Sequence, residues 1–504
     1  GLYVASNTGD LAVLGMSAPD APGLSQTLRL TDSGQKLTAM SLLAGGISLI
    51  TGSDNGEIEQ WFMVRNDQNK DELTLIRDFD PLGNQAIEHI VPEYGRRGFI
   101  VSDTAGNIGV YYSTSGRQVL ETQVRDGAIS ELAVSPRSDL LIVNTDNGKV
   151  HGFNLHNEHP EISWSSLWGK VWYESYTEPQ FVWQSSSASN DFEPKFSLVP
   201  LSFGTLKAAF YAMLFAMPLA IMGAIYTAYF MAPDLRRMVK PTVEVMEALP
   251  TVILGFLAGL WLAPVVENNL PGIFSMLLLL PFGVIVFAYG WSRTPYSVRR
   301  WVPEGWQPAL LVPAIVVFAT IALLLSKPLE LWLFGGNMPL WLDQELGISY
   351  DQRNALVVGL AMGFAVIPTI FSIAEDAIFS VPKQLSNGSL ALGATPWQTL
   401  VRVVLPTASP GIFSSVMIGM GRAVGETMIV LMATGNTPVM DGSPFQGMRT
   451  LSANIAVEMP ESEVGSTHFR ILFLAGLVLF MFTFIFNTVA ELVRQRLREK
   501  YSNL

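Results

Sequence analysis

The pattern of hydrophobic and polar residues changes once along the chain. Residues 1–176 hold short stretches in which apolar and polar residues alternate, separated by polar, glycine-containing turns. This alternation is typical of β-strands with one buried face. Residues 197–504 instead hold long apolar runs, and runs of about 20 residues predict membrane-spanning helices. The pattern predicts an all-β N-terminal domain, a flexible linker over residues 177–196 and an all-α polytopic membrane domain.

Four segments of the N-terminal domain repeat one arrangement: an apolar strand, a polar turn that ends in glycine, and a second alternating strand. The repeats are Tyr3–Leu14, Ile50–Phe62, Ile100–Tyr112 and Ile142–Phe153, with turn glycines Gly9, Gly56, Gly106 and Gly148. These glycines recur at intervals of roughly 42–50 residues, which is close to the blade period of propeller repeats. The dipeptides Asn55–Gly56 and Asn147–Gly148 favour type I′ turns, which need positive φ.

The repeats resemble the blades of WD40-like or quinoprotein-like β-propellers, although the Trp-Asp signature of WD40 repeats is missing. A β-sandwich with similar hairpins is the alternative. Closed propellers usually have 4–8 blades, so sequence upstream of residue 1 could supply further blades. His151, His156 and His159 cluster near the last repeat. No carboxylate or thiolate pattern accompanies them, which favours surface histidines over a metal site.

Seven apolar runs follow, each close to the length that spans a bilayer. They are approximately Leu201–Met231, Leu249–Val266, Gly272–Trp291, Trp306–Leu325, Ala355–Ile373, Pro410–Met432 and Phe469–Val493. Lys and Arg concentrate after the first run (Arg236, Arg237 and Lys240), after the third and fifth runs, and in the C-terminal tail. The positive-inside rule makes these segments cytoplasmic. We therefore expect a periplasmic N-terminal domain, a cytoplasmic C-terminus and one further helix upstream of residue 1.

The composition narrows the range of functions. Only 15% of the 504 residues are charged, against about 25% in a soluble domain. The net charge of −12 arises in the N-terminal part, and such an acidic surface argues against nucleic acid as a partner. The absence of cysteine rules out disulfides, thiolate zinc sites and cysteine nucleophiles. No Walker A sequence occurs, so we expect a chain that hydrolyses no ATP itself and holds no cofactor or metal.

Residues 374–406, between the fifth and sixth runs, have a distinctive spacing. Asn387-Gly388-Ser389 is followed by three residues, Gly393, nine residues and Val403-Val404-Leu405-Pro406. This spacing resembles the EAA loop of ABC importer permeases, with Asn387 and Gly388 in place of the family's glutamate and first alanine. The resemblance implies a short helix that docks on an ATPase through Leu390, Ala391 and Leu392. A turn at Gly393 and a second helix closed by Pro406 would follow. An ordinary amphipathic loop is the alternative.

The sixth run contains two charged residues, Arg422 and Glu426, four residues apart. In a continuous helix this spacing places both on one face. Charges at bilayer depth usually face a protein interior or a transport pathway. We therefore expect Glu426 to neutralise Arg422 in the resting state. A structural ion pair that only fixes helix packing is the alternative.

The segment Gly421–Thr427, followed by Gly435-Asn436-Thr437, resembles the fifth core helix of phosphate-specific ABC transporter permeases of the PstC type. Parts of residues 192–219, 247–256 and 452–484 resemble the same family, whereas the β domain and residues 268–351, an apparent extra helical hairpin, do not. The resemblance implies a bacterial inner-membrane subunit that imports phosphate, with Arg422, Glu426 and Thr427 on the substrate pathway.

The same resemblance implies the partners. They would be a sister permease, an ABC ATPase dimer and a periplasmic phosphate-binding protein, with inorganic phosphate as the substrate. Two alternatives stay open at this point. One is import of another oxyanion, and the other is a membrane-anchored sensor or scaffold whose propeller is the working part.

Overall fold

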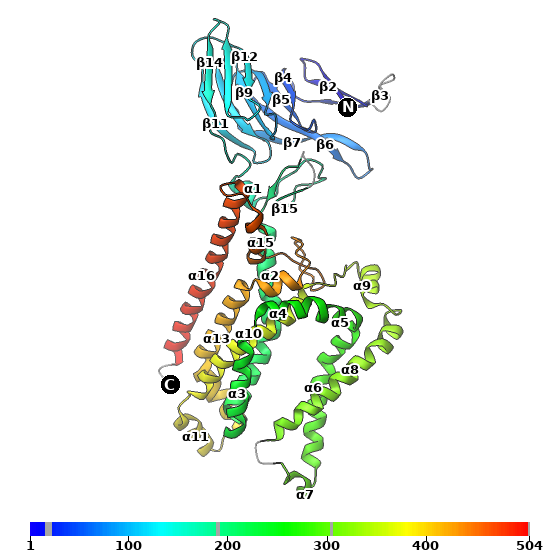
Figure 1. The fold of residues 1–504 in the computed structure, drawn as a ribbon, viewed down its shortest axis with the longest axis vertical. Helices are drawn as coiled ribbons and strands as arrows, with labels where there is room; N and C mark the ends of the chain where they lie inside the picture. Colours follow the sequence, from blue (N-terminus) through cyan, green and yellow to red (C-terminus); the bar gives the residue numbers. More distant parts are fainter. Residues whose placement is uncertain (16–22, 188–191, 303–305, 502–504) are drawn as a thin grey trace. The chain divides into compact units, whose positions relative to one another are not determined.

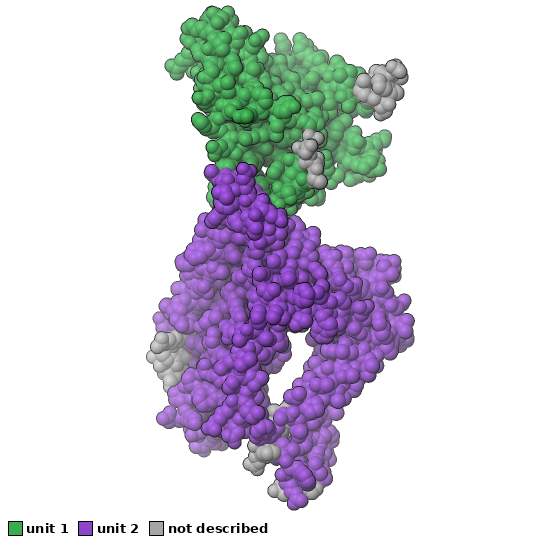
Figure 2. Space-filling view, viewed as in Figure 1, with its two compact units in different colours: residues 1–199 green, residues 200–504 purple. Residues whose placement is uncertain are grey.

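The computed structural model describes residues 1–15, 23–187, 192–302 and 306–501. It contains two compact units, residues 1–199 and residues 200–504, coloured green and purple in Figure 2. The first unit is built from β-sheets and the second from helices (Figure 1). Each unit has hydrophobic clusters of its own, so each is described by itself.

The β unit contains four consecutive antiparallel sheets, which we call blades 1 to 4. Blade 1 is β1 (Leu2–Ala5), β2 (Asp10–Gly15) and β3 (Gly23–Arg29), and blade 2 is β4 (Leu37–Leu42), β5 (Leu49–Ser53), β6 (Ile58–Arg65) and β7 (Asp71–Phe79). Blade 3 is β8 (Ile87–Pro92), β9 (Gly98–Asp103), β10 (Asn107–Tyr112) and β11 (Arg117–Gln123). Blade 4 is β12 (Ile129–Val134), β13 (Leu140–Thr145) and β14 (Val150–Asn154). Within each blade the strands pair in chain order, as in propeller repeats. The predicted all-β, propeller-like domain is confirmed, and over the described residues the four sheets form an open series.

The turn glycines of the four repeats occupy equivalent hairpins. Their φ angles are +85°, +89°, +83° and +72° for Gly9, Gly56, Gly106 and Gly148. The prediction of type I′ turns was wrong, because Asn55 and Asn147 do not share the positive φ of the glycines that follow them. Instead the Asn55 side-chain oxygen accepts a hydrogen bond from the Glu57 amide (3.3 Å). Each hairpin thus has a single left-handed glycine after its turn, the other common hairpin geometry.

The blades pack face to face through three hydrophobic clusters. Leu11 and Val13 of blade 1 pack with Leu49 and Trp61 of blade 2. The next two interfaces repeat the arrangement at equivalent positions, with Phe99, Val101 and Tyr111 facing blade 2 and Leu141, Val143 and Phe153 facing blade 3. The positions seven before and five after the turn glycine therefore face the preceding blade each time.

Blade 1 carries the same pattern of apolar residues on one face. Among the described residues, no other blade packs against that face. Its equivalent positions are Leu2 and Leu14, and Val4, five residues before Gly9, corresponds to Val101 and Val143. Leu2 and Val4 are 47% and 50% exposed, whereas Leu49 and Phe99 in blades 2 and 3 are 1% and 0% exposed. Blade 1 therefore has the apolar residues that pack against a preceding blade in blades 2 to 4, although in blade 1 the face that carries them is exposed.

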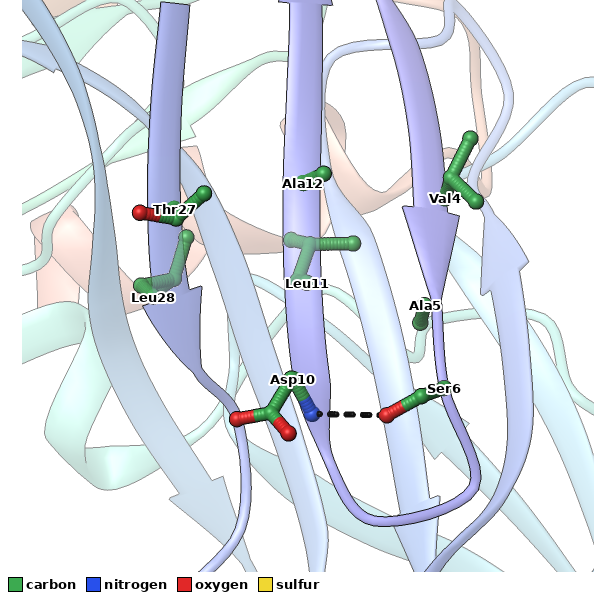
Figure 3. Close-up of a pocket in the computed structure, with 8 residues that line it drawn as sticks. All are labelled: Val4, Ala5, Ser6, Asp10, Leu11, Ala12, Thr27 and Leu28. Atoms are coloured by element: carbon green, nitrogen blue, oxygen red, sulfur yellow. Dashed lines mark hydrogen bonds between the residues drawn. The ribbon is translucent and has the colours of Figure 1, made fainter. Parts of the chain in front are cut away.

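A shallow pocket runs across the three strands of blade 1 (Figure 3). It is lined by Val4, Ala5, Ser6, Asp10, Leu11, Ala12, Thr27 and Leu28. Val4, Ala12 and Thr27 form one cross-strand row, and the Asp10 amide donates to the Ser6 hydroxyl (3.3 Å). The lining has one carboxylate and two hydroxyls among aliphatic side chains, but no basic side chain that could activate a hydroxyl, so it does not form a catalytic group.

The segment assigned to a linker is partly folded onto the β unit. Helix α1 (Trp164–Trp168) precedes residues 177–196, and those residues contain the small hairpin of β15 (Trp183–Gln184) and β16 (Lys195–Phe196). Trp183 and Phe196 are 3% and 4% exposed, and their ring centroids are 5.5 Å apart. Burial of these aromatic residues explains why the first unit extends to residue 199. Residues 188–191, in the serine-rich part of the expected linker, lie outside the described residues.

The helical unit runs from α2 to α16. Its α-helices are α2 (Val199–Ile225), α3 (Pro233–Glu247), α4 (Thr251–Leu257), α5 (Ala263–Asn268), α6 (Leu270–Arg293), α7 (Tyr296–Arg299), α8 (Leu311–Leu333), α9 (Met338–Leu346), α10 (Ala355–Phe379), α11 (Lys383–Ala391), α12 (Pro396–Thr399), α13 (Leu405–Gly425), α14 (Met428–Ala433), α15 (Leu451–Glu458) and α16 (Thr467–Tyr501). Wider or tighter helical turns occur at η1 (Tyr226–Phe230), η2 (Ala258–Leu262), η3 (Gln307–Leu310), η4 (Leu400–Val404) and η5 (Met459–Glu461).

Seven helical segments in the described part of this unit are long and apolar enough to cross a membrane. They are Val199–Phe230, Thr251–Asn268, Leu270–Arg293, Leu311–Leu346, Ala355–Phe379, Pro396–Gly425 and Thr467–Arg496. The seven predicted spans are therefore confirmed. The sixth differs in its limits, because α13 ends at Gly425 and α14 resumes only at Met428.

Helices α6 and α8 form the extra hairpin expected over residues 268–351. A Cβ atom added at Gly283 would lie 2.4 Å from the Phe318 ring, and one at Gly272 would lie 2.8 Å from Ser326. Glycines thus let the two helices approach closely, as small residues do in membrane bundles. Figure 2 shows an opening through the helical unit between this hairpin and the other helices.

Helix α10 is central to the remaining helices (Figure 1). It packs on α13, where a Cβ atom at Gly419 would lie 2.5 Å from Ile370. It packs on α2, where a Cβ atom at Gly359 would lie 2.8 Å from Tyr211. These close approaches fix α10 against both neighbours and position the side chains described next.

Candidate functional site

Arg422, near the end of α13, is held by residues of two other helices. Its Nη1 atom donates to Glu247 Oε1 (2.6 Å) and to Thr369 Oγ1 (2.5 Å). Thr369 in turn donates to the same carboxylate oxygen (3.0 Å). We call Arg422, Glu247 and Thr369 the arginine triad. Because α13, α3 and α10 each contribute one member, the hydrogen bonds of the triad depend on the relative positions of these three helices.

The expected pairing of Arg422 with Glu426 was wrong. Glu426 follows the last residue of α13 and has an extended backbone (φ −66°, ψ 129°). The four-residue spacing therefore does not place the two side chains on one helix face, since that rule holds only within a continuous helix. The Glu426 carboxylate instead accepts hydrogen bonds from the backbone amides of Met428 (3.1 Å) and Ile429 (3.3 Å).

Glu426 thus caps the first turn of α14, and Thr427 completes the break. The Thr427 hydroxyl donates to the Gly425 carbonyl oxygen (3.3 Å), and the Glu426 carbonyl oxygen accepts from the Ser452 hydroxyl (2.9 Å). These bonds satisfy backbone groups that an interrupted helix leaves unpaired. Glu426 and Thr427 are therefore adjacent to Arg422 in the chain, but they shape the helix break.

A second helix break lies on the other side of the triad. Helix α3 ends at Glu247, and α4 begins at Thr251 after Pro250. The two broken helices pack tightly beyond the triad, because a Cβ atom at Gly255 would lie 2.8 Å from the Met428 carbonyl oxygen. Substrate sites of transporters are commonly built where broken helices meet. The arrangement can present a cation beside the interrupted backbone at the ends of α3 and α13.

The charges of the triad are accessible as well as paired. The Arg422 and Glu247 side chains are 30% and 45% exposed. A charge inside a membrane segment normally pairs with another charge and faces a pathway or protein interior. An anion that reaches Arg422 would compete with Glu247 for the guanidinium, since both are oxygen acceptors.

The loop with the expected ATPase-docking sequence forms two short helices joined by a bend. α11 contains Asn387, Gly388, Ser389, Leu390 and Ala391, and none of its residues is buried. The bend has the left-handed glycine that was expected, with φ +88° at Gly393. Leu392 just before it is 92% exposed, so an apolar side chain projects from the tip of this loop.

Hydrogen bonds hold this bend in place. The amides of Gly393 and Ala394 donate to the carbonyl oxygens of Leu390 (3.0 Å) and Ser389 (3.2 Å). The hydroxyls of Ser389 and Thr399 are 2.9 Å apart and join α11 to α12. The loop is therefore a folded knob and not an extended connection.

Pro406 does not end the second helix of this loop, contrary to the prediction. The chain stays helical from α12 through the wide turn η4 into α13, and Pro406 is the second residue of α13. A proline clashes with the carbonyl four residues before it in a regular helix, and a wide turn relieves such a clash. The Thr407 hydroxyl donates to the Val403 carbonyl oxygen (2.7 Å), which compensates for the disturbed backbone bonding. The second half of the docking loop, from Pro396, and Arg422 thus belong to one nearly continuous helical segment.

A metal ion in this chain, which has no cysteine, would need a group of histidine and carboxylate ligands. Among the described residues no group of three or more histidine, aspartate or glutamate side chains could hold an ion. His151 lies 3.5 Å from Asp126, and His159 lies 3.8 Å from Glu158, so the histidines near the last repeat have acidic neighbours at the surface of the β unit.

Comparison with known proteins identifies the helical unit. The family described as binding-protein-dependent transport system inner membrane component matches residues 216–499. The chain belongs to this family. With its seven membrane-capable helices, it is a multi-pass inner-membrane permease of the ABC transporter type and not a hydrolase.

Named relatives within this family point to one group of permeases. The probable ABC transporter permease YqgH of Bacillus subtilis is 28% identical over 61% of this chain and 74% of its own length. The phosphate transport system permease PstC of Mesorhizobium japonicum is 27% identical over 63% of this chain and 79% of its own. PstC of Xylella fastidiosa is 30% identical over 48% of this chain and 76% of its own. The suspected relationship to permeases of the PstC type is confirmed.

Two members of the arginine triad were missed by sequence reasoning. Glu247 stands three residues before Pro250, at the edge of an apolar run, and this position could have marked it as an intramembrane charge. Thr369 lies inside an apolar run and carries no such signal. Both become recognisable only when the permease fold brings α3 and α10 beside α13.

Proposed function

We propose that this permease is one transmembrane subunit of an ABC-type phosphate importer. The arginine triad carries the proposal: it puts an accessible guanidinium where two broken helices meet in an apolar unit. Phosphate is a small dianion, and arginine binds its oxygens by charge-assisted hydrogen bonds. The PstC relatives, whose names refer to phosphate transport, support the same substrate.

In this proposal Glu247 is the resting counterion of Arg422 in place of Glu426. Phosphate entering the pathway displaces the Glu247 carboxylate, and Thr369 and the backbone around Thr427 stay beside the bound anion. When phosphate leaves, Glu247 returns and neutralises Arg422. The pathway itself is shared with a sister permease subunit.

The proposed subunit is driven by a separate ABC ATPase dimer that docks on α11 and the Gly393 bend. A periplasmic phosphate-binding protein delivers the substrate at the opposite side. The Lys- and Arg-rich loops then lie in the cytoplasm, with the β unit in the periplasm and the C-terminus inside the cell. The exposed, folded knob at Leu392 supports this assignment, since a permease without a motor partner has no need of such a surface.

The test is the variant Arg422→Gln in the assembled transporter. Arg422→Gln should lower phosphate uptake in proteoliposomes at least about tenfold, the rate equivalent of about 1.4 kcal/mol, while co-purification with the ATPase and sister permease is unchanged. Arg422→Lys, which keeps the charge but loses the planar donor fork, should retain part of the uptake. Normal uptake by Arg422→Gln would exclude the proposed role.

Competition among anions tests the substrate. Arsenate has the shape and protonation chemistry of phosphate and should inhibit uptake in proportion to its concentration. Sulfate, which lacks an ionisable proton near neutral pH, should not. Inhibition by sulfate alone would mean that the permease carries another oxyanion.

A further inference from the structure

Helix α3 is fixed to α10 at two separate levels. At the triad, Glu247 of α3 accepts from Thr369 of α10 (3.0 Å). Closer to the docking loop, Lys240 of α3 binds Glu375 of α10 (2.9 Å), and Arg236 forms an ion pair with the same carboxylate. Arg236 and Lys240, which indicated the orientation of the chain in the membrane, therefore also bind α3 to α10.

The acidic residue at this second level is fully buried. Glu375 is 0% exposed, and a buried carboxylate is costly unless it is paired. Lys240 also binds Asp376, and the Arg236 guanidinium lies 3.5 Å from the centre of the Phe379 ring. We call Arg236, Lys240, Glu375 and Asp376 the cytoplasmic clamp, because by the charge argument this end of α10 is the cytoplasmic one.

The spacing of the contacts shows that the two helices run antiparallel. Glu247 lies seven residues after Lys240, and Thr369 lies six residues before Glu375. At 1.5 Å per residue these spacings are about 10.5 Å and about 9 Å. The two sets of polar contacts therefore lie at matching heights along both helices. Together they hold α3 and the second half of α10 as one rigid body.

The docking helix lies between this body and the helix that carries Arg422. On one side only residues 380–382 separate α10 from α11. On the other side the Gly393 bend joins α11 to α12, which continues through η4 into α13. A wide helical turn such as η4 is a common point of adjustment within a helix. Movement of α11 can therefore reach Glu247 through α10 and α3, and Arg422 through α13.

We infer that the cytoplasmic clamp couples the docking helix to the arginine triad. Displacement of α11 by the ATPase shifts the α3–α10 body relative to α13 and so changes the separation of Glu247 from Arg422. Lys240 and Glu375 are then positioning residues, which act on the anion site through α3. The inference rests on the proposed function, because it assumes an ATPase on α11.

The first test measures the triad directly in the purified transporter. The chain contains no cysteine, so cysteines at Val245 and Ile418, which are 67% and 45% exposed, can carry spin labels on α3 and α13. The distance between the labels is measured without nucleotide and with a non-hydrolysable ATP analogue. We expect the analogue to shift this distance in the otherwise unchanged protein and to shift it by less than half as much in the double variant Lys240→Gln, Asp376→Asn.

Arg237→Gln is the matched control. Arg237 lies on the same helix, but its side chain is 82% exposed and forms an ion pair with Asp234 of α3 (3.8 Å). Its nucleotide-dependent shift should equal that of the unchanged protein. Equal shifts in the clamp variant and the control would overturn the inference, and so would a distance that never responds to nucleotide while the ATPase is bound.

The second test measures coupling as transport per ATP. In proteoliposomes the clamp variant should carry at least about fivefold less phosphate per ATP hydrolysed, the lower end of the range for coupled sites. Its ATPase rate and subunit composition should stay unchanged. A purely structural role would lower the yield of complex and leave this ratio constant. If the unchanged transporter shifts its label distance but moves no phosphate, the proposed substrate fails while the coupling stands.

Discussion

At the scale of single residues, two glycines of the docking loop should respond oppositely to alanine. Gly388 lies within α11, and Gly393 has φ +88° at the bend. Nothing lies within 4 Å of an added Cβ at either position, so only backbone preference decides the outcome. Gly388→Ala should stabilise the loop by about 1 kcal/mol, and Gly393→Ala should destabilise it by about 1–2 kcal/mol.

Amide hydrogen exchange at residues 392 and 393 measures this difference. Both amides donate to carbonyl groups within α11, so their protection reports the population of the folded bend. Gly388→Ala should slow their exchange and Gly393→Ala should speed it. Changes of the same sign in both variants would contradict the role of the left-handed glycine.

A partly buried glutamate of the β unit, Glu193, predicts a pH dependence. Burial is the main cause that raises the pKa of Glu193 from 4.5 to about 7, although the Thr114 hydroxyl bonded to it acts in the opposite direction. The folded unit therefore binds a proton that the unfolded chain releases between about pH 4.5 and 7. The contribution of Glu193 to stability should be greatest at low pH, fall as the pH rises through that window and level off above it.

The variant Glu193→Gln removes this titration and should flatten the profile. The measurement is the opening free energy of blade 3 amides by hydrogen exchange, corrected for intrinsic exchange at each pH. Burial also raises the pKa of Glu59 to about 7, so Glu59→Gln should flatten the profile separately. A slope that persists in the double variant would assign the pH dependence to other groups.

The limits of sequence reasoning are clear at this scale. The arginine in the sixth run and the docking glycine could both be found, because a charge in an apolar run and a glycine at a fixed spacing are local signals. The partner of Arg422 could not, since Glu247 is 175 positions away in the chain. The nearest acid in sequence, Glu426, was chosen because the helix was assumed to continue past Gly425.

At the scale of elements, a substitution at the tip of the docking loop should change ATPase binding without changing the stability of the permease. Leu392 is 92% exposed, so Leu392→Asp removes an apolar contact surface without opening a cavity. We expect Leu392→Asp to prevent capture of the ATPase by the permease while the thermal stability of the permease changes by less than about 0.5 kcal/mol. Val464, at 82% exposure in the turn before α16, provides the matched control Val464→Asp. Retained ATPase binding by Leu392→Asp would remove the loop from the proposed function.

The extra hairpin predicts a packing effect. A Cβ atom at Gly283 would lie 2.4 Å from the Phe318 ring, whereas nothing lies within 4 Å of one at Gly290 on the same helix. Gly283→Ala should separate α6 from α8 at a cost of about 1–3 kcal/mol, as overpacking does in a close contact. Gly290→Ala should be neutral or stabilising. Cross-linking yield between cysteine pairs on α6 and α8 measures the difference, and equal yields would contradict close packing at Gly283.

Elements were predicted well where the signal is long or periodic. Seven long apolar runs and four glycine hairpins correspond to seven membrane-capable segments and four sheets. Their ends were less predictable, because Pro406 was expected to end a helix that a wide turn instead carries onward. The expected linker contains Trp183 and Phe196, which are buried in the first unit, and the sequence carries no local signal for the surface that buries them.

At the scale of the whole molecule, the helical unit should assemble with the ATPase and the sister permease without the β unit. Its hydrophobic cluster is built from residues after 200, and the docking loop and arginine triad belong to the same unit. Removal of residues 1–198 should therefore leave co-purification with the ATPase and sister permease unchanged. A cut at residue 190 is a poorer choice, because it would strip Phe196 and Leu198, which are 4% and 0% exposed, of the β unit that buries them.

The same truncation separates two roles of the β unit in transport. If that unit recruits the phosphate-binding protein, uptake by the truncated transporter should fall at limiting concentrations of loaded binding protein and recover when its concentration is raised, since a lost docking contact weakens affinity and leaves the pathway intact. The Arg422→Gln variant is the contrast, because its uptake should stay low at every concentration. Loss of assembly after truncation would instead show that the β unit stabilises the permease, and the division into two independently packed units would have to be abandoned.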